Sequence, residues 1–299
     1  GYIVPISSTA TEGYLDLQKI LLGRKLWFTS FDDRPAHLFD GLDKNTLSIL
    51  LSSDRTATPS VMSSRLNRWN SEEREVLFSR LRLHETPACP LPGALPRLSD
   101  DIEFSIWGKL FARPDKLASA FAPRGKFRTY FSRKVNSFLQ VLDFVPEVRD
   151  GKGKLRPPSE FKEMLFDRAD HAAAAFCLLN STLFRWFMDV VSDGSHLNRR
   201  ETDLFPFDPR RVRDLSAFTR LAKRLSNDLK KNSFERKMTY KHDTLRVQCI
   251  VPKHSKSIID EIDGLLAQYY GLSDDELDFI RNYDIKYRLG REEESDDEA

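Results

Sequence analysis

The stretch YIVPISSTATEGYLDLQKILLGRKLWFTSF, residues 2–31, decides which fold we expect for the start of the chain. Residues 2–6 are a short apolar run that predicts a buried strand, and residues 14–22 carry apolar side chains at helical spacing. Residues 26–31 and 46–51 predict two further strands. This order of elements is typical of the closing end of an α/β sheet, and a sheet with two buried faces needs more strands. We therefore expect other strands to complete it, and a first residue other than Met fits a processed product or a fragment.

The composition is that of an ordinary globular protein, with 299 residues of which 40% are hydrophobic and 31% charged. Three cysteines stand far apart and form no CxxC pair, and the six histidines form no HExxH motif, so we expect no disulfide framework and no metal site. The longest apolar stretch, residues 172–191, is interrupted by polar side chains and predicts one long buried helix rather than a membrane span. No secretory leader opens the sequence, so we expect a cytoplasmic protein with no membrane partner.

The net charge of +2 conceals an uneven distribution. Residues 257–299 hold fourteen acidic against four basic residues, whereas residues 109–134 hold eight basic against one acidic. Residues 199–246 hold fourteen basic against seven acidic. A solvated surface could explain either basic cluster alone, but two such clusters in one chain favour a polyanionic partner, and nucleic acid in particular.

A self-contained catalytic motif is missing from the sequence. It has no Walker loop, no GxSxG and no GxGxxG, and no pair of carboxylates is spaced for metal or acid–base chemistry. Pro157-Pro158 follows Arg156, so it lacks the Asn-Pro-Pro-aromatic form that grips an adenine amino group. We therefore expect no catalytic residue in this chain.

Seven short strings carry a resemblance to a known family. They are YIVPIS at 2–7, W…FDDRP…LFDG…NTLSIL between 27 and 50, RW…SEER…LF between 68 and 78, LDFVP at 142–146, LNS…LF…WF between 179 and 187, SD…HLN between 192 and 198, and NYDIKYR at 282–288. In this order they resemble the adenine-specific DNA methyltransferases fused into type IIG restriction–modification enzymes, and the resemblance spans nearly the whole chain.

The resemblance implies a partner and a cofactor that this chain does not hold alone. Such enzymes flip the target adenine out of the duplex to reach its amino group. The family's glycine motif for S-adenosylmethionine and its Asn-Pro-Pro-aromatic clamp both precede the segments that match here. The expected partners are therefore double-stranded DNA and an N-terminal catalytic region or subunit, and we expect no methylation by this chain alone.

The resemblance also implies a fold class and a division into domains. The fold would be an incomplete α/β domain, the closing strands of a Rossmann-like methyltransferase sheet, followed by a mixed α+β target-recognition domain and C-terminal helices. The boundaries are 1–56 for the edge of the catalytic domain, 57–98 for a helical linker, 99–210 for target recognition, 211–291 for the helical segment and 292–299 for a disordered acidic tail. Four prolines between residues 87 and 96 mark the linker.

Two groups of residues are candidates for contacts with DNA. By resemblance, five residues border the pocket for the flipped base: Asp32, Arg34, Phe39, Asp40 and Asn45. For Phe39 the favoured alternative is a position in the core. For Arg34 an alternative is a surface ion pair. The second group is basic and aromatic. For two of its members, His196 and Asn198, the alternative is a position in the turn that ends the buried helix. Its members are Arg113, Lys126, Arg128, Tyr130, Arg133, Lys134, His196, Asn198, Arg199 and Arg200.

The strand expected at residues 127–131 gives the second group its geometry. Alternation places Arg128 and Tyr130 on one face and Phe127 and Phe131 on the other, which predicts a basic reading surface above an apolar anchor. An arginine there could read guanine edges or hold phosphates, and the sequence leaves both roles open.

The sequence is therefore interpreted as the DNA-recognition part of a site-specific adenine-N6 DNA methyltransferase for restriction–modification or phage defence. One alternative is a stand-alone specificity module that works with a separate catalytic subunit. Another is a scaffold whose basic patches contact an acidic protein, which salt-dependent duplex binding would distinguish.

Overall fold

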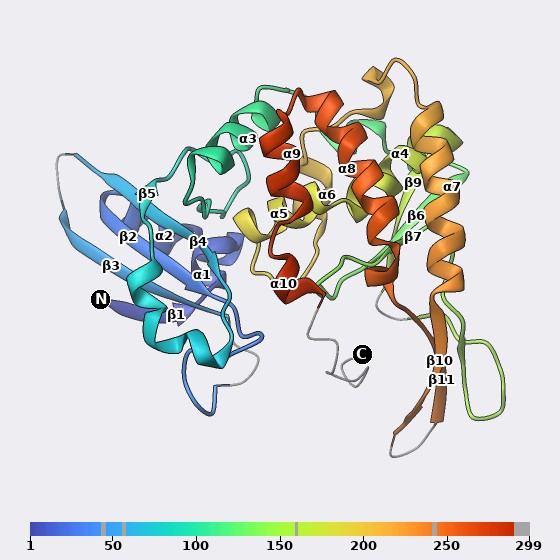
Figure 1. Ribbon diagram of the computed structural model, residues 1–299, viewed down its shortest axis with the longest axis horizontal. Helices are drawn as coiled ribbons and strands as arrows, with labels where there is room; N and C mark the ends of the chain where they lie inside the picture. Colours follow the sequence, from blue (N-terminus) through green and yellow to red (C-terminus); the bar gives the residue numbers. More distant parts are fainter. Residues whose placement is uncertain (43–45, 56–57, 159–160, 241–243, 290–299) are drawn as a thin grey trace. The chain divides into compact units, whose positions relative to one another are not determined.

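The computed structural model describes the chain as two compact units of mixed α and β structure, with several small sheets and many helices (Figure 1). The description omits residues 43–45, 56–57, 159–160, 241–243 and 290–299, so Asn45 and the predicted tail at 292–299 lie outside it. Unit 1 consists of residues 1–112 and 186–196, and unit 2 of residues 113–185 and 197–299. The domain boundaries given above stay predictions.

A five-stranded sheet in the order β1-β3-β2-β4-β5 forms the frame of unit 1. β3 is antiparallel to both β1 and β2, β4 is parallel to β2, and β5 is antiparallel to β4. The strands are β1 (Tyr2–Pro5), β2 (Arg24–Phe31), β3 (Leu47–Arg55), β4 (Ser60–Asn67) and β5 (His84–Glu85); the helices are α1 (Ser7–Ala10), η1 (Glu12–Tyr14), α2 (Leu15–Leu22), η2 (Ser71–Val76), η3 (Phe78–Arg80) and α3 (Asp101–Phe111).

The first three strands and the first long helix lie where the sequence predicted them. The prediction that the first strand is buried is wrong, because Tyr2 and Ile3 of β1 are exposed, and β4 was not predicted. β4 lies within the segment 57–98 that was predicted to be a helical linker, in a polar stretch that includes Ser63 and Ser64. In the sheet these serines are buried and hydrogen-bonded: the Ser64 hydroxyl lies 2.6 Å from the Thr29 hydroxyl, and the Ser63 hydroxyl donates to the Pro96 carbonyl at 2.9 Å. A polar sequence therefore forms an internal strand because each hydroxyl has a partner.

The segment 186–196 returns to unit 1 and is fixed there by polar contacts. The Trp186 indole donates to the Glu103 carboxylate at 3.0 Å, and the Arg97 guanidinium donates to the Asp189 carbonyl at 2.9 Å. The Asp189 side chain accepts two hydrogen bonds from Arg68, at 2.7 and 3.0 Å. Unit 1 is therefore assembled from two stretches of sequence.

Unit 2 contains two three-stranded sheets and most of the helices. One sheet has the order β7-β6-β9 and packs against α4, and in the other, β10-β11-β8, the hairpin β10–β11 extends from the end of α7 (Figure 1). The strands are β6 (Phe127–Ser132), β7 (Val141–Leu142), β8 (Val148–Arg149), β9 (Phe161–Phe166), β10 (Ser233–Thr239) and β11 (Thr244–Ile250). The helices are η4 (Leu117–Ala120), α4 (Ala169–Asn180), α5 (Thr182–Val191, which crosses into unit 1), α6 (Arg199–Leu204), η5 (Pro209–Arg211), α7 (Ser216–Lys231), η6 (Pro252–Ser255), α8 (Lys256–Tyr270), α9 (Asp274–Arg281) and α10 (Ile285–Arg288).

The single long helix predicted at 172–191 is wrong, because α4 ends at Asn180 and α5 begins at Thr182. Ser181 has an extended backbone, its hydroxyl donates to the Leu178 carbonyl at 2.6 Å, and it accepts from the Phe184 amide at 3.0 Å. The Ser side chain thus closes one helix and caps the next. In the part of the chain that the structure describes, no single helix is long and apolar enough to cross a bilayer, and only α4 and α5 taken together as a bent pair reach that length and composition.

Candidate nucleic-acid interface

The loop after β2 carries the residues predicted at the rim of the base pocket. Asp32 is half-buried and accepts from the Nε of Arg68 at 2.7 Å, so its carboxylate is used to hold the loop. Arg34 forms the surface ion pair that was its alternative, with Nε 3.9 Å from the Asp33 carboxylate. Burial, reinforced by a hydrogen bond to Asp32, raises the pKa of Asp33.

The outer part of the same loop is exposed. The ring of Phe39 is 37% exposed, so the core position favoured for it is wrong, and Asp40 is also exposed. Arg74 fixes this part of the loop by donating to the carbonyls of His37 and Leu38 at 3.0 and 2.9 Å. The loop therefore presents a half-exposed aromatic ring on a backbone that is held in place.

The strand β6 is the middle strand of its sheet, and its pairing with β9 runs without a register shift from Phe127 to Ser132. Because the register is regular, Arg128 and Tyr130 share one face, as predicted. On the other face Phe131 is buried, and the Thr129 hydroxyl donates to the Ala172 carbonyl of α4. Phe127 is 40% exposed, so only Phe131 serves as the predicted apolar anchor.

Three of the four cations on and around β6 have no ion-pair partner among the described residues, and the fourth has an exposed one. Arg128 lies 3.6 Å from the Glu163 carboxylate, and both side chains are about half exposed. Lys126, Arg133 and Lys134 are exposed, and none of them forms an ion pair with any residue that the structure describes. Four cations from nine residues of sequence therefore face solvent along one strand and its ends.

The start of α6 lies beside this strand, since the Leu197 amide donates to the Arg133 carbonyl at 2.8 Å. The Arg199 guanidinium lies 5.4 Å from the ring centroid of Phe121 and donates to the Glu163 carbonyl at 2.6 Å. These contacts hold Arg199 against the sheet while its side chain stays 44% exposed. Arg199 is therefore placed to extend the basic surface of β6.

Several of the other predicted DNA contacts are used within the fold. Asn198 caps the start of α6 in a capping box with Glu201, so it begins a helix and does not sit in a turn that ends one. Arg200 is nearly buried and donates to the Glu201 carboxylate at 2.5 Å. Burial raises the pKa of Glu201, and Arg200 opposes this rise.

Arg113 and His196 also have structural partners. The Arg113 guanidinium donates to the Tyr269 carbonyl and lies 4.3 Å from the centroid of the Tyr269 ring. In unit 1, His196 is exposed, and its Nδ1 lies 3.5 Å from the Asp193 carboxylate. Arg113 thus has a role in folding, and His196 belongs to a different unit from β6.

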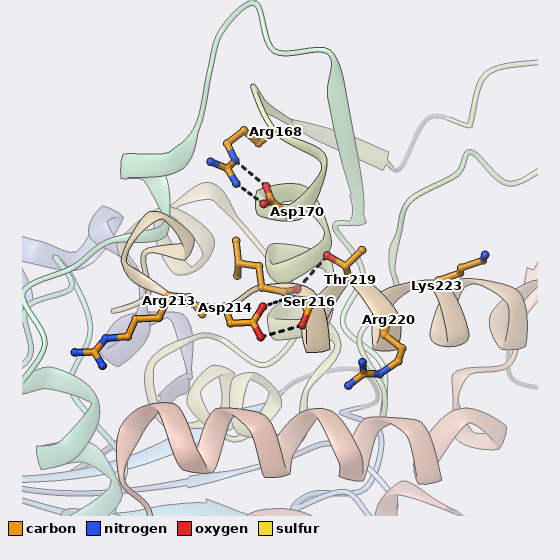
Figure 2. A pocket seen from close by; sticks show the side chains of 10 residues that line it. Arg168, Asp170, Arg213, Asp214, Ser216, Thr219, Arg220 and Lys223 are labelled. Carbon is orange, nitrogen blue, oxygen red and sulfur yellow. Dashed lines mark hydrogen bonds and ion pairs between the residues drawn. The ribbon is translucent and has the colours of Figure 1, made fainter.

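The structure also reveals a basic groove in unit 2 that the sequence did not predict, with a volume of about 660 Å³ (Figure 2). Arg168, from the turn before α4, faces residues around the start of α7 across this groove. No local pattern links residue 168 to residues 213–223, so only the excess of basic residues after Arg199 could have drawn attention to one side of it. The charged side chains that line it are Arg168, Asp170, Arg213, Asp214, Arg220 and Lys223.

Among the residues that the structure describes, no group of three or more His, Cys, Asp or Glu side chains is arranged to hold a metal ion. Compared with models of protein families and with curated proteins, the chain matches none of them.

Proposed function

We propose that this chain recognises DNA sequence as part of a site-specific adenine-N6 DNA methyltransferase whose catalytic motifs lie in another region or subunit. The observation that carries the proposal is the set of exposed cations on β6 and its ends. Lys126, Arg133 and Lys134 form no ion pair with a described residue, and Arg128 has only a half-exposed pair with Glu163 at 3.6 Å. Like charges gathered on one surface repel one another, and a polyanion removes that cost.

The aromatic residues of β6 support a reading role beyond simple charge attraction. Tyr130 is half-buried on the same face as Arg128, and Phe127 is largely exposed at the start of the strand. Phosphate contacts position a protein on the duplex, whereas side chains that reach base edges specify the sequence. A strand with cations at both ends and an Arg–Tyr pair between them can supply both kinds of contact.

Unit 1 supports the methyltransferase part of the proposal. In unit 1 the strand β1 is followed by α2 and then by β2. β1 and β2 run parallel, because each of them is antiparallel to β3. Two parallel strands joined by a helix form a βαβ unit. In the described chain β1 is an edge strand, and its Tyr2 side chain is 69% exposed. On α2, apolar side chains are exposed too, Ile20 most of all. We infer that this apolar edge continues into the other strands of a Rossmann-like methyltransferase sheet, since such exposed surface marks an interaction site.

In that arrangement the loop after β2 would border the pocket for the flipped adenine. The half-exposed ring of Phe39 would be available to stack on the base, and Arg34 and Asp40 are exposed beside it. S-adenosylmethionine would be bound by the catalytic region and not by this chain.

Removing the two adjacent cations at the end of β6 tests the DNA interface. Arg133→Ala combined with Lys134→Ala should weaken duplex binding and flatten the slope of log affinity against log salt by about one to two units, because each phosphate contact contributes about 0.9. The measurement is fluorescence anisotropy with a labelled duplex over a range of NaCl concentrations. The matched control is Lys152→Ala with Lys154→Ala, which removes the same charge from an exposed turn of unit 2.

Far-UV circular dichroism should show both double variants folded, because exposed charges contribute little to stability. If the folded Arg133/Lys134 variant binds duplex with the slope of the unchanged protein, β6 is not the DNA interface and the proposal fails.

Arg128→Ala should affect sequence discrimination and not the electrostatic part of binding. If Arg128 contacts a guanine edge, its loss reduces discrimination by about 1–3 kcal/mol at one position of the site while the salt slope stays nearly constant. Selection of bound duplexes from a random library should show one position of the enriched site become degenerate. An unchanged site with a slope lower by about one unit would instead identify Arg128 as a phosphate contact.

The chain alone should transfer no methyl group to DNA, and transfer should appear when a region that carries the donor and clamp motifs is added. Both samples, the chain alone and the chain with the added region, are assayed by the incorporation of tritiated methyl groups from S-adenosylmethionine into mixed duplex DNA. Incorporation by this chain alone, above a heat-inactivated sample, would contradict the assignment of catalysis to another region.

A further inference from the structure

The groove at the start of α7 contains carboxylates that are already engaged (Figure 2). Asp170 accepts from the Arg168 guanidinium at 2.9 and 2.5 Å, and Asp214 accepts from the amide and hydroxyl of Ser216 at 2.8 and 3.0 Å. Hydrogen bonds from Arg168 hold the pKa of Asp170 below its ordinary value, and those from Ser216 do the same for Asp214. Both acids are therefore ionised. Arg168 neutralises Asp170, whereas Ser216 carries no charge, so the negative charge of Asp214 remains in the groove, where it acts on Arg220 and offsets one of the groove's cations.

Three cations of the groove keep their charge exposed. Arg213, Arg220 and Lys223 are exposed and form no ion pair with any other residue in the described part of the chain. Arg224, the next residue of α7, behaves differently, because Glu261 of α8 accepts two hydrogen bonds from it, at 2.6 and 2.8 Å. The protein thus neutralises one exposed arginine of this helix and leaves its neighbours free to bind an anion.

One further exposed cation, Lys231, lies on the same face of α7, beyond the Arg224–Glu261 pair. Arg220 and Lys223 are three residues apart and therefore neighbours on the helix surface. Lys231 lies eleven residues after Arg220, which is about three turns and about 16 Å along the same face, and it too is exposed without an ion pair among the described residues. A row of this length fits an extended polyanion better than a single small anion.

We propose that this groove and the adjoining face of α7, defined by Arg213, Arg220, Lys223 and Lys231, bind the phosphodiester backbone of DNA outside the bases that β6 reads. The inference rests on the proposed function and adds a second contact surface to it. Only two apolar residues, Val212 and Leu215, line the groove, so it offers little to an organic ligand. Cations on a helix face that lack hydrogen-bonding partners of fixed geometry give affinity without reading sequence.

The test is the double variant Arg220→Ala with Lys223→Ala, measured against a random-sequence duplex of about 30 base pairs over a range of NaCl concentrations. We expect the slope of log affinity against log salt to flatten by about one to two units and binding at low salt to weaken about tenfold. The site enriched from a random duplex library should not change. Arg220→Lys with Lys223→Arg should keep the original slope, and Lys152→Ala with Lys154→Ala is again the charge-matched control.

The outcomes separate this inference from the proposed function. If the unchanged chain shows no salt-dependent duplex binding, both are overturned. If the Arg133/Lys134 variant loses binding while the folded Arg220/Lys223 variant keeps the original affinity and slope, only the groove is overturned. A change in the enriched site in the Arg220/Lys223 variant would also overturn it, because the groove would then read bases.

Discussion

Arg68→Ala should lower the free energy of unfolding of unit 1 by about 3–5 kcal/mol, the cost of leaving a buried carboxylate without its cation. The guanidinium binds Asp189 with two hydrogen bonds, at 2.7 and 3.0 Å, and Asp32 through Nε at 2.7 Å. The Asp189 side chain is only 1% exposed, so water cannot replace the lost partner. The same change frees Asp32 at the start of the loop that carries Phe39, so the predicted pocket rim would lose its support.

Urea unfolding followed by tryptophan fluorescence measures this effect, because all four tryptophans, Trp27, Trp69, Trp107 and Trp186, lie in unit 1. The control is Arg80→Ala, which breaks an exposed pair with Glu73 at 3.0 Å and should cost less than about 1 kcal/mol. Equal losses for the two variants would show that the Arg68 cluster contributes no more than a surface ion pair.

Asp263→Asn should change the pH dependence of stability of unit 2. The Asp263 carboxylate is fully buried on α8 and accepts from the amides of Thr182 and Leu183 at 3.3 and 3.1 Å, at the start of α5. Burial raises the pKa of Asp263 to about 6, opposed by these hydrogen bonds and by nearby cations. In the unfolded chain its pKa is about 3.9.

Between these two values the folded state binds more protons than the unfolded state, so stability from this group falls as the pH rises. The contribution is complete below about pH 4 and is lost as the pH passes about 6, a loss of about 2–3 kcal/mol. An asparagine cannot titrate, so the difference in unfolding free energy between the unchanged protein and the variant should shift by that amount in favour of the variant from pH 4 to pH 7.

Urea unfolding followed by far-UV circular dichroism at several pH values tests this shift. The control is Glu261→Gln on the same helix. The ion pair with Arg224 lowers the pKa of Glu261, and the Glu261 side chain is exposed. The shift in unfolding free energy with pH for this variant should therefore be small and of opposite sign. A difference between the unchanged protein and the Asp263 variant that stays constant with pH would contradict the prediction.

Local signals in the sequence were enough to place β1, β2, β3 and α2, because short apolar runs and helical spacing are visible without knowledge of distant partners. They did not predict which of these elements are buried, since Tyr2 and Ile3 of β1 and Ile20 of α2 are exposed. β4 was missed because the burial of Ser63 and Ser64 depends on hydrogen-bond partners at Pro96 and Thr29, and no local pattern reveals such pairs. The break between α4 and α5 was visible as Asn180-Ser181-Thr182, but three polar residues are equally compatible with a continuous helix.

For the candidate interface too, only the features with a local signal could be predicted from the sequence. The excess of positive charge around β6 could be counted from the sequence. The regular alternation of side chains along β6, which places Arg128 and Tyr130 on one face, could also be predicted. Whether a given arginine is free could not be predicted, because its partner lies far away in the chain. Arg113, for example, contacts Tyr269, which is 156 residues later in the chain.

The path of α5 has a consequence for how the specificity of such a protein can change. Unit 2 begins after Ala112, but the chain re-enters unit 1 at Trp186, in the middle of this helix. A recombination event with one crossover in the proline-rich segment at residues 87–96 would bring in a foreign Asp189 and separate Arg68 from the carboxylate it evolved with. Exchange of unit 2 alone would need crossovers near residues 112, 185 and 196, because residues 186–196 belong to unit 1. If unit 2 recognises DNA as proposed, we therefore expect its target to change mainly by point substitutions on exposed side chains.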